Sequence, residues 1–540
     1  MTPAYDLVVR SGTIYDGTGA APYPGDVAVS GDTIAAVGVV DGRGEREIDA
    51  TGLAVAPGFI NMLSWATDSL IEDGRSQSDI RQGVTLEVFG EGWSMGPLSD
   101  VMKRQTRERQ GDIKYEVVWE TLGGFLDHLA SRGIATNVAS LVGATTVRIH
   151  VLGHEDRPPT PSELDRMRGL VDEAMREGAI GVGSSLIYAP ACFARTDELV
   201  ALCEVAARYG GLYTSHIRSE TDGLMGAVNE LIEIVRSTGV RGEIYHLKQA
   251  GRQHWPKLET VIERVEAARR SGLGVTADMY TYTAGATGLY AIMPPWVQEG
   301  GHRAWVERLR DPAIRARVVD EMRRPADGWE NFLHSVESAD GILLASLQSE
   351  RLKHLTGKTL GEVARRHGVS PEDAAIALVV EDDSRVGAIY FTMSEDNLRR
   401  EVRLPWMAFG SDAGSLSPEG AFLRSNPHPR AYGTFARLLA RYVRDEGLIP
   451  LEEAVRRLTS FPAATLGIER RGRLAVGMYA DVVVFDPVHV QDHATYEEPH
   501  RYATGVVHVL VNGEPVISEG EHTGATPGRV VRGPGWTGAL

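Results

Sequence analysis

Two histidines that each end a short apolar run have the clearest potential for chemistry in this chain. His216 closes the run that begins at Gly211, and His246 closes the run that begins at Glu243. One histidine in such a setting is more often a structural hydrogen-bonding group, but these two end successive predicted strands. Because neutral imidazole is the most common protein ligand for Zn²⁺, the pair indicates a metal site.

A carboxylate upstream could complete that site. Glu91 follows a strand-like run and opens a glycine-rich loop. It would offer an oxygen ligand to a divalent cation, whereas the simplest alternative is a solvated loop acid. Glu87 is a competing candidate, because alternation along a strand places it on the same face as Glu91. It comes four residues earlier in the chain, so it should lie deeper in the fold. Spacing alone therefore leaves Glu91 a weak candidate.

Asp412 is a candidate general base. It ends the last strong strand-like run before the terminal helices, 406–412. Its ordinary interpretation is an N-cap for the helix that follows. Beside a metal, it would instead take a proton from an activated water.

Two cations could bind an anionic part of a substrate. Lys248 lies two residues after His246 and on the same strand face by alternation. Arg430 ends a proline-rich stretch, 426–430. Arginine would hold a carboxylate through two hydrogen bonds, and the alternative for both residues is an ordinary surface charge.

Strands that alternate with helices would bring these residues together. Residues 57–465 alternate short apolar runs with longer amphipathic stretches, which is the pattern of a (β/α)8 barrel with parallel strands. In such barrels the catalytic groups lie at the carboxyl ends of the strands. The charged stretch 295–355 has a helical pattern and predicts an insertion that could form a lid.

The two ends of the chain predict a second, smaller domain. Residues 1–56 and 466–540 contain short β-rich runs separated by glycine-containing turns, such as the hairpin signal at Asn512-Gly513. We expect the two ends to pair into a β-sandwich domain, so that the whole fold is α/β.

The composition limits the kinds of molecule that this protein could bind. The 540 residues are 24% charged and 43% hydrophobic, as in a globular protein of more than one domain. The net charge of −17 argues against nucleic acid and anionic membranes as partners. With two cysteines, no secretory signal and no apolar run that could cross a bilayer, we expect a cytoplasmic protein. The sequence leaves open whether the chain forms a homo-oligomer.

Several phrases together resemble the D-aminoacylase (N-acyl-D-amino-acid deacylase) branch of the amidohydrolase superfamily. They run in order along essentially the whole chain, at residues 57–60, 83–85, 213–220, 246–251, 278–285, 410–412, 428–433 and 472–481. The resemblance implies a (β/α)8 barrel with a β-sandwich built from both termini. It also implies hydrolysis of an amide bond at a Zn²⁺ site.

The resemblance also implies roles for single residues. His216 and His246 match the histidines that hold the tightly bound metal, and the family's cysteine ligand falls on or next to Glu91. Asp412 matches the aspartate of the eighth strand. The positions that hold the substrate α-carboxylate match Lys248, Arg430 and a tyrosine, Tyr282 or else Tyr280.

The chain departs from the family at the first barrel strand. The family's His-x-His pair, which binds a second metal, is replaced here by Leu63 and Trp65, and neither side chain can be a ligand. The resemblance extends to N-acetylglucosamine-6-phosphate deacetylases with one metal on a glutamate and two histidines. We therefore expect one Zn²⁺ per chain on Glu91, His216 and His246, with Leu63 and Trp65 as walls of the substrate pocket.

The leading hypothesis is an amidohydrolase that acts on an N-acyl-D-amino acid or a related small amide with a free carboxylate. Two alternatives remain open. The same site could act on a lactam, a cyclic imide or a specialised metabolite, including in the condensing direction. The loss of the first-strand histidines would also fit a catalytically inactive barrel that acts as a binding protein.

Overall fold

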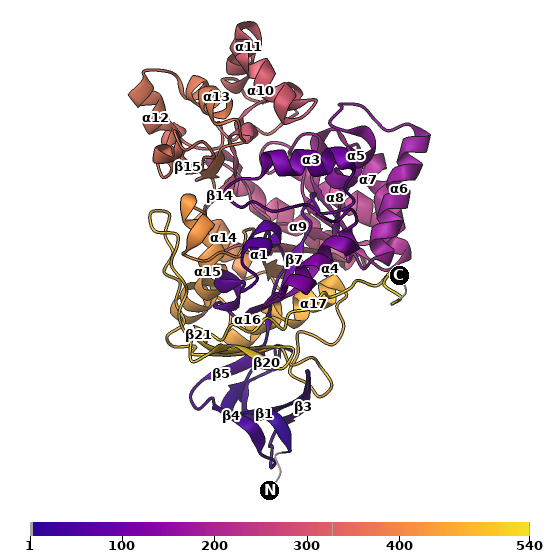
Figure 1. The fold of residues 1–540 in the computed structure, drawn as a ribbon, viewed down its shortest axis with the longest axis vertical. Coiled ribbons are helices and arrows are strands. Elements are labelled where there is room, and N and C mark those ends of the chain that lie inside the picture. The colour runs from indigo at the N-terminus through magenta and orange to yellow at the C-terminus, as the bar shows by residue number, and fades with distance from the viewer. Residues whose placement is uncertain (1–3, 327, 539–540) are drawn as a thin grey trace.

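A (β/α)8 barrel occupies the centre of the molecule (Figure 1). The computed structural model describes residues 4–326 and 328–538. The barrel strands are β6 (Phe59–Asn61), β7 (Val84–Phe89), β8 (Asn137–Ser140) with its continuation β9 (Val142–Gly143), which together form one barrel strand, β10 (Gly181–Ser185), β11 (Leu212–His216), β12 (Arg241–Ile244), β13 (Val275–Met279) and β17 (Met407–Phe409).

Parallel pairing gathers the carboxyl ends of these strands at one end of the barrel. One hydrogen-bonded sheet runs β6-β7-β8 and the other runs β17-β13-β12-β11-β10-β9. Backbone hydrogen bonds join the first and last strands, since Met62 N donates to Phe409 O (3.3 Å) and Asp412 N donates to Leu63 O (2.9 Å). Catalytic groups of such barrels lie at this end.

Amphipathic helices cover the outside of the barrel. The helix α6 (Pro161–Arg176) begins with a capping box in which Thr160 and Glu163 bond each other's backbone N–H. It buries Met167 and Val171. The other helices around the barrel are α1 (Thr67–Glu72), α2 (Gln77–Ile80), α3 (Asp100–Arg109), α4 (Leu122–Arg132), α5 (Ala144–Leu152), α7 (Thr196–Arg208), α8 (Leu224–Thr238), α9 (Leu258–Arg270), α14 (Glu395–Val402), α15 (Arg430–Arg437) with its π-helical continuation Leu438–Asp445, α16 (Leu451–Leu458) and α17 (Ser460–Leu466).

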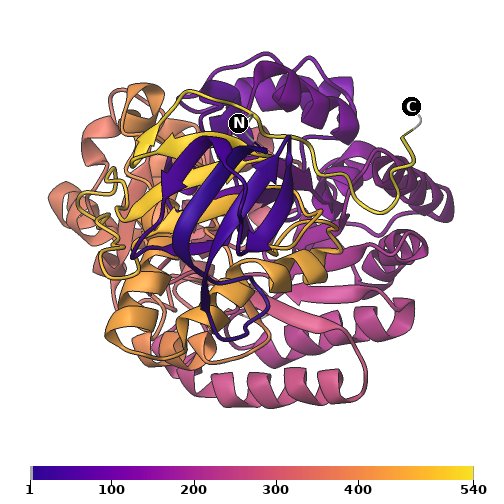
Figure 2. The same ribbon diagram turned by 90° about the horizontal axis from the view of Figure 1, so that it is seen from below.

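The two ends of the chain share one nine-stranded sheet that lies across the other end of the barrel (Figure 2). Its strands are β1 (Tyr5–Ile14), β2 (Tyr23–Ser30), β3 (Thr33–Gly38), β4 (Gly44–Asp49), β5 (Ala54–Pro57), β18 (Val482–Phe485), β19 (Val506–Val511), β20 (Glu514–Ser518) and β21 (Glu521–His522). The N- and C-terminal segments meet where β5 pairs antiparallel with β18. Apolar side chains such as Val9, Val27 and Val482 form its buried core.

An inserted unit projects above the carboxyl ends of the barrel strands (Figure 1). It contains β14 (Gly285–Gly288), α10 (His302–Arg310), α11 (Pro312–Met322), β15 (Ile342–Ser346), α12 (Leu360–His367), α13 (Pro371–Asp382) and β16 (Gly387–Tyr390). The insertion is therefore longer than the predicted range 295–355, and it holds an antiparallel sheet as well as helices. The pattern did not reveal β14 because the sequence Gly-Ala-Thr-Gly has no large apolar residues.

Candidate metal site and active-site cavity

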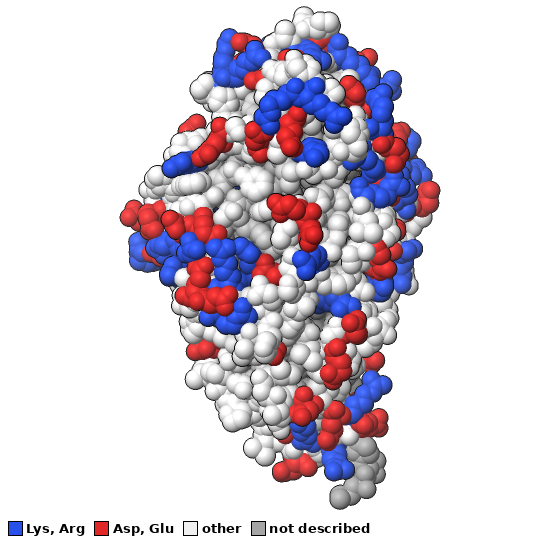
Figure 3. Space-filling view, turned by 90° about the vertical axis from the view of Figure 1, so that its left-hand side faces the viewer, with Lys and Arg blue, Asp and Glu red and all other residues white. Residues whose placement is uncertain are grey.

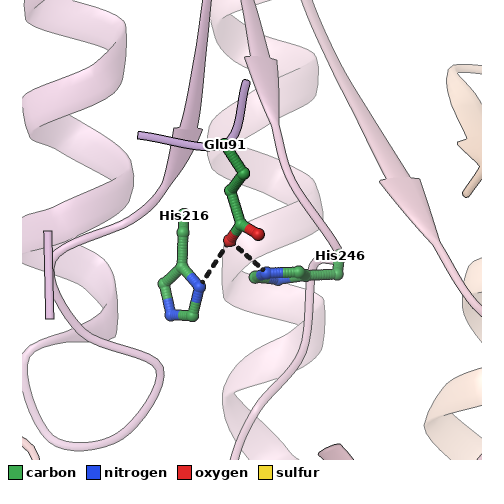
Figure 4. Close-up of side chains that lie close together, drawn as sticks. All are labelled: Glu91, His216 and His246. Carbon is green, nitrogen blue, oxygen red and sulfur yellow. Dashed lines mark hydrogen bonds and ion pairs between the residues drawn. The ribbon is translucent and has the colours of Figure 1, made fainter. Parts of the chain in front are cut away.

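Glu91, His216 and His246 converge at the barrel end (Figure 4). Glu91 Oε1 lies 2.9 Å from His216 Nδ1 and 2.9 Å from His246 Nε2. Each residue follows or ends a barrel strand: Glu91 comes just after β7, His216 ends β11, and His246 comes just after β12. All three side chains are buried. The barrel thus brings together residues that are far apart in the sequence.

The donor set fits a divalent metal such as zinc. One carboxylate oxygen and two imidazole nitrogens lie within 4.8 Å of one another. A carboxylate with two histidines is a typical catalytic zinc set that leaves a fourth position open. The competing candidate, Glu87, is buried within β7 and accepts hydrogen bonds from the hydroxyls of Ser64 and Ser76.

The backbone is unusual at two of the site residues. His246 has a φ of 34° and Asp412 has a φ of 49°. Such left-handed conformations are uncommon for residues other than glycine, and they cluster at functional sites. Both residues lie within three residues of the end of a barrel strand, and both side chains line the cavity.

Glu220 is a buried residue that the sequence interpretation did not assign. Its Oε1 lies 2.6 Å from Lys248 Nζ, 3.3 Å from His216 Nε2 and 3.5 Å from His246 Nδ1. Burial alone would raise the pKa of Glu220, but the Lys248 ammonium and the two imidazoles lower it. A carboxylate on the outer nitrogens of metal-binding histidines orients their rings. The only sequence signal was its position four residues after His216.

Trp65 contacts both carboxylates of the site. Its indole Nε1 donates to Glu91 Oε2 (3.0 Å) and to Asp412 Oδ1 (3.1 Å). Trp65 is 38% exposed and lines the cavity, whereas Leu63 is fully buried and does not line it. The prediction for Leu63 is wrong because its side chain packs into the barrel interior beside Ile60.

Asp412 and Arg430 form an ion pair at the cavity. Arg430 Nη1 lies 2.8 Å from Asp412 Oδ2. Burial raises the pKa of Asp412, and the charge of Arg430 opposes that rise. Arg430 is buried, and its Nε and Nη1 atoms have no well-aligned hydrogen-bond acceptor in the described residues. A guanidinium in this state can accept an anionic ligand.

Tyr280 faces the cavity and Tyr282 does not. The Tyr282 hydroxyl donates to Asp492 Oδ2 (3.4 Å), away from the site. Of the two tyrosines that the resemblance offers, Tyr280 is therefore the one at the cavity, and the expectation for Tyr282 is wrong because its hydroxyl bonds Asp492 instead. Burial raises the pKa of Tyr280 to about 12, so its phenol stays protonated and can donate.

A cavity of about 240 Å³ opens beside the metal ligands. The barrel and the inserted unit both contribute to it, with Lys248 and Arg430 on the barrel side and Phe332 and Tyr390 on the insertion side. Its aromatic lining consists of Trp65, Trp93, Tyr188, Tyr280, Tyr290, Phe332 and Tyr390. A pocket that combines aromatic walls with convergent polar groups is typical of a small-molecule site.

The surface carries charges of both signs. Acidic and basic side chains are intermixed on the face shown in Figure 3, without a continuous basic patch. Among the described helices, none combines the length and the apolar character that crossing a bilayer requires.

Comparisons with known proteins agree with the fold and with metal-dependent hydrolysis of an amide. Residues 46–517 match the protein family described as "Amidohydrolase family". The chain is 33% identical to a D-aminoacylase of Alcaligenes xylosoxydans xylosoxydans over 98% of this chain and 97% of that protein. The fold is also similar to a structure of N-acyl-D-glutamate deacylase from Bordetella bronchiseptica, which is complexed with zinc and a phosphonate inhibitor. The two chains are 31% identical with a TM-score of 0.80, and the match covers 98% of this chain and 99% of that one.

A D-aminoacylase structure described with a binuclear metal centre is 32% identical, with a TM-score of 0.81, over 98% of this chain and 100% of that one. The chain therefore belongs to the amidohydrolase family, in its D-aminoacylase branch. It is a metal-dependent hydrolase of carbon–nitrogen bonds other than peptide bonds, with a small-molecule amide as substrate.

Proposed function

We propose that the chain is a mononuclear zinc amidohydrolase that removes the acyl group from an N-acyl-D-amino acid. The observation that carries the proposal is the convergence of Glu91, His216 and His246 on one point beside the cavity. D-Aminoacylase and N-acyl-D-glutamate deacylase, which the chain resembles over nearly its full length, support this substrate class.

One metal fits the residues better than two. The first-strand positions hold Leu63 and Trp65, which cannot ligate. The indole N–H of Trp65 already bonds one oxygen of Glu91 and one oxygen of Asp412. The indole thus occupies the space between the two carboxylates that a second cation would need in order to bridge them.

Asp412 would serve as the general base and then as the acid. When bound, zinc supplies Lewis-acid polarisation of the scissile carbonyl and of the attacking water. Asp412 accepts the proton that the water loses as it attacks the carbonyl carbon, and returns it to the amine nitrogen as the C–N bond breaks. Arg430, 2.8 Å from Asp412, holds that carboxylate in place.

The buried cations would orient the substrate by its α-carboxylate. Arg430 has guanidinium atoms without a well-aligned acceptor in the described residues, and Lys248 and Tyr280 face the same cavity. Burial alone would lower the pKa of Lys248, but the nearby Glu220 carboxylate more than offsets this effect. The pKa of Lys248 is therefore raised, and the ammonium stays charged. Three donors of this kind suit one carboxylate.

Metal analysis and metal removal test the proposal. We expect about one zinc per purified chain, loss of hydrolysis of N-acetyl-D-amino acids after chelation, and recovery when Zn²⁺ is added back. The absence of bound metal, or full activity after chelation, would contradict the mechanism. A content of two zinc ions per chain would contradict only the mononuclear site.

A further inference from the structure

Arg385 is a cation at the cavity for which the proposed chemistry has no use. It lines the cavity and is exposed. Among the described residues it forms no ion pair and no side-chain hydrogen bond, whereas Lys248 pairs with Glu220 and Arg430 pairs with Asp412. Arg385 is therefore a cavity cation without an ion pair in the described structure, and the carboxylate nearby is that of Asp68, whose pKa burial raises and the Arg385 charge in part lowers.

Arg385 lies in the turn between α13 and β16, and hydrogen bonds stabilise this turn. The buried Asp382 accepts hydrogen bonds from the backbone of Ser349 (2.8 Å) and from Ser384. Val386, the next residue after Arg385, has a φ of 48°, which is strained for a β-branched side chain. The backbone of Arg385 is thus held in one position instead of moving freely at the rim.

Aromatic rings connect Arg385 to the metal ligands along one wall of the cavity. The guanidinium lies 5.5 Å from the centre of the Tyr290 ring. Tyr290 packs on Tyr188 at 5.3 Å, and Tyr188 packs on His216 at 5.1 Å. Arg385 and His216 thus lie on one aromatic wall, and both line the same cavity.

A second arginine lies close enough to Arg385 for the two charges to interact. Arg109, at the end of α3, has its pKa lowered by burial and by the nearby charge of Arg385. It also forms no ion pair or side-chain hydrogen bond in the described residues. The charges of Arg385 and Arg109 repel each other, and the nearby carboxylates of Asp68 and Glu108 offset part of that repulsion.

We propose that Arg385 forms an anion subsite, so that the preferred substrates carry a carboxylate besides the α-carboxylate. This inference rests on the proposed function. The additional carboxylate could belong to the side chain of the amino acid, as in N-acetyl-D-glutamate, or to the acyl group, as in N-succinyl-D-alanine. Both would place an anionic group away from the scissile bond.

Two matched pairs of substrates distinguish these sources. N-acetyl-D-glutamate is compared with N-acetyl-D-glutamine, and N-succinyl-D-alanine is compared with N-succinamoyl-D-alanine, its terminal amide. In each pair only the charge of the outer group differs appreciably. The ratio of kcat/KM for the acidic and neutral members is measured for the zinc-loaded enzyme and its variants.

Arg385→Gln should lower the acidic-to-neutral ratio about tenfold for one pair, the loss expected for one hydrogen bond to a charged group. Arg385→Lys should keep most of the ratio because it keeps the charge. Arg351→Gln is the matched control, since Arg351 lies in the same inserted unit, is 71% exposed and pairs with Glu381. It should leave the ratio of both pairs within twofold.

Binding gives a readout that does not need turnover. Dissociation constants for the four compounds are measured by calorimetry in an Asp412→Asn background, with and without Arg385→Gln. Equal acidic-to-neutral ratios with and without Arg385, in both pairs, would overturn the anion subsite. If the zinc-loaded wild type hydrolysed none of the four compounds, the proposed function would fail, while the binding ratios would still decide the role of Arg385.

Discussion

At the residue scale, every carboxylate oxygen in the centre of the site has a partner. Glu91 Oε1 faces the two histidines, and Glu91 Oε2 accepts the Trp65 N–H. Asp412 Oδ1 accepts the same N–H, and Asp412 Oδ2 faces Arg430. A single neutral donor therefore lies between two acidic groups that would otherwise repel each other.

Trp65→Phe keeps an aromatic ring but removes the shared donor. We expect kcat to fall about tenfold and zinc to bind about ten times more weakly, because Glu91 loses the bond that orients it. Kinetics and competition with a chelator measure both effects. Trp93→Phe is the control, since Trp93 also lines the cavity but has no such bond in the described residues. Equal behaviour of the two variants would remove the role assigned to the indole N–H.

Asp412→Asn tests the general base separately from the metal. The amide keeps the size and one acceptor oxygen but cannot take up a proton. We expect kcat to fall by about two to four orders of magnitude, while the zinc content stays the same. Metal analysis and steady-state kinetics on the same preparation check this. A variant that kept its zinc and most of its activity would show that another group accepts the proton.

At the element scale, strand ends explain which site residues the sequence could reveal. Glu91, His216, His246 and Asp412 each follow or end a barrel strand, so apolar runs pointed to them. Leu63 and Tyr282 are assigned by resemblance, which matches a position in the sequence but does not give the direction of a side chain beyond the ends of β6 and β13. Glu220 lies in a loop and Arg385 in a turn of the inserted unit, where only long-range packing brings them to the cavity. Helical periodicity likewise revealed α10 and α11, but not the glycine-rich β14.

Glu330 connects the inserted unit to the barrel through hydrogen bonds. Its raised pKa predicts that the stability of the fold depends on pH. Its buried carboxylate accepts hydrogen bonds from Glu220 N (3.2 Å) and Thr221 Oγ1 (3.0 Å). Burial, together with the charge of Glu220, raises the pKa of Glu330 to about 7. The folded state then binds more protons than the unfolded state, so this stabilisation is complete below about pH 4.5 and is lost as the pH rises through 7.

Glu330→Gln should remove this loss of stability at higher pH, which amounts to roughly 3 kcal/mol of unfolding free energy at most. Thermal unfolding from pH 5 to 8 should therefore show the Tm of the variant gaining on that of the wild type as the pH rises. Glu337→Gln is the control, because Glu337 lies nearby but is 79% exposed. Parallel pH profiles for the wild type and Glu330→Gln would contradict the assignment.

At the scale of the whole molecule, the sheet that covers the barrel and the site of the chemistry lie at opposite ends of the barrel. The sheet from both termini covers one end, and the site with the inserted unit occupies the other (Figures 1 and 2). The last segment of the chain extends this cover. Gly528 N donates to Ile134 O (2.7 Å), Val531 N donates to Val138 O (2.8 Å), and Gly533 N donates to Gly178 O (2.8 Å).

Deleting residues 524–540 should therefore lower the Tm by several degrees and leave the chemistry nearly intact. The deletion exposes backbone groups before and within β8 and in the turn before β10, which are far from the metal ligands at the strand ends. We expect kcat/KM at 25 °C to stay within about twofold of the full chain and the zinc content to be unchanged. A large loss of zinc or of kcat in a deletion variant that remains folded at 25 °C would show that the covered end of the barrel also controls the geometry of the site.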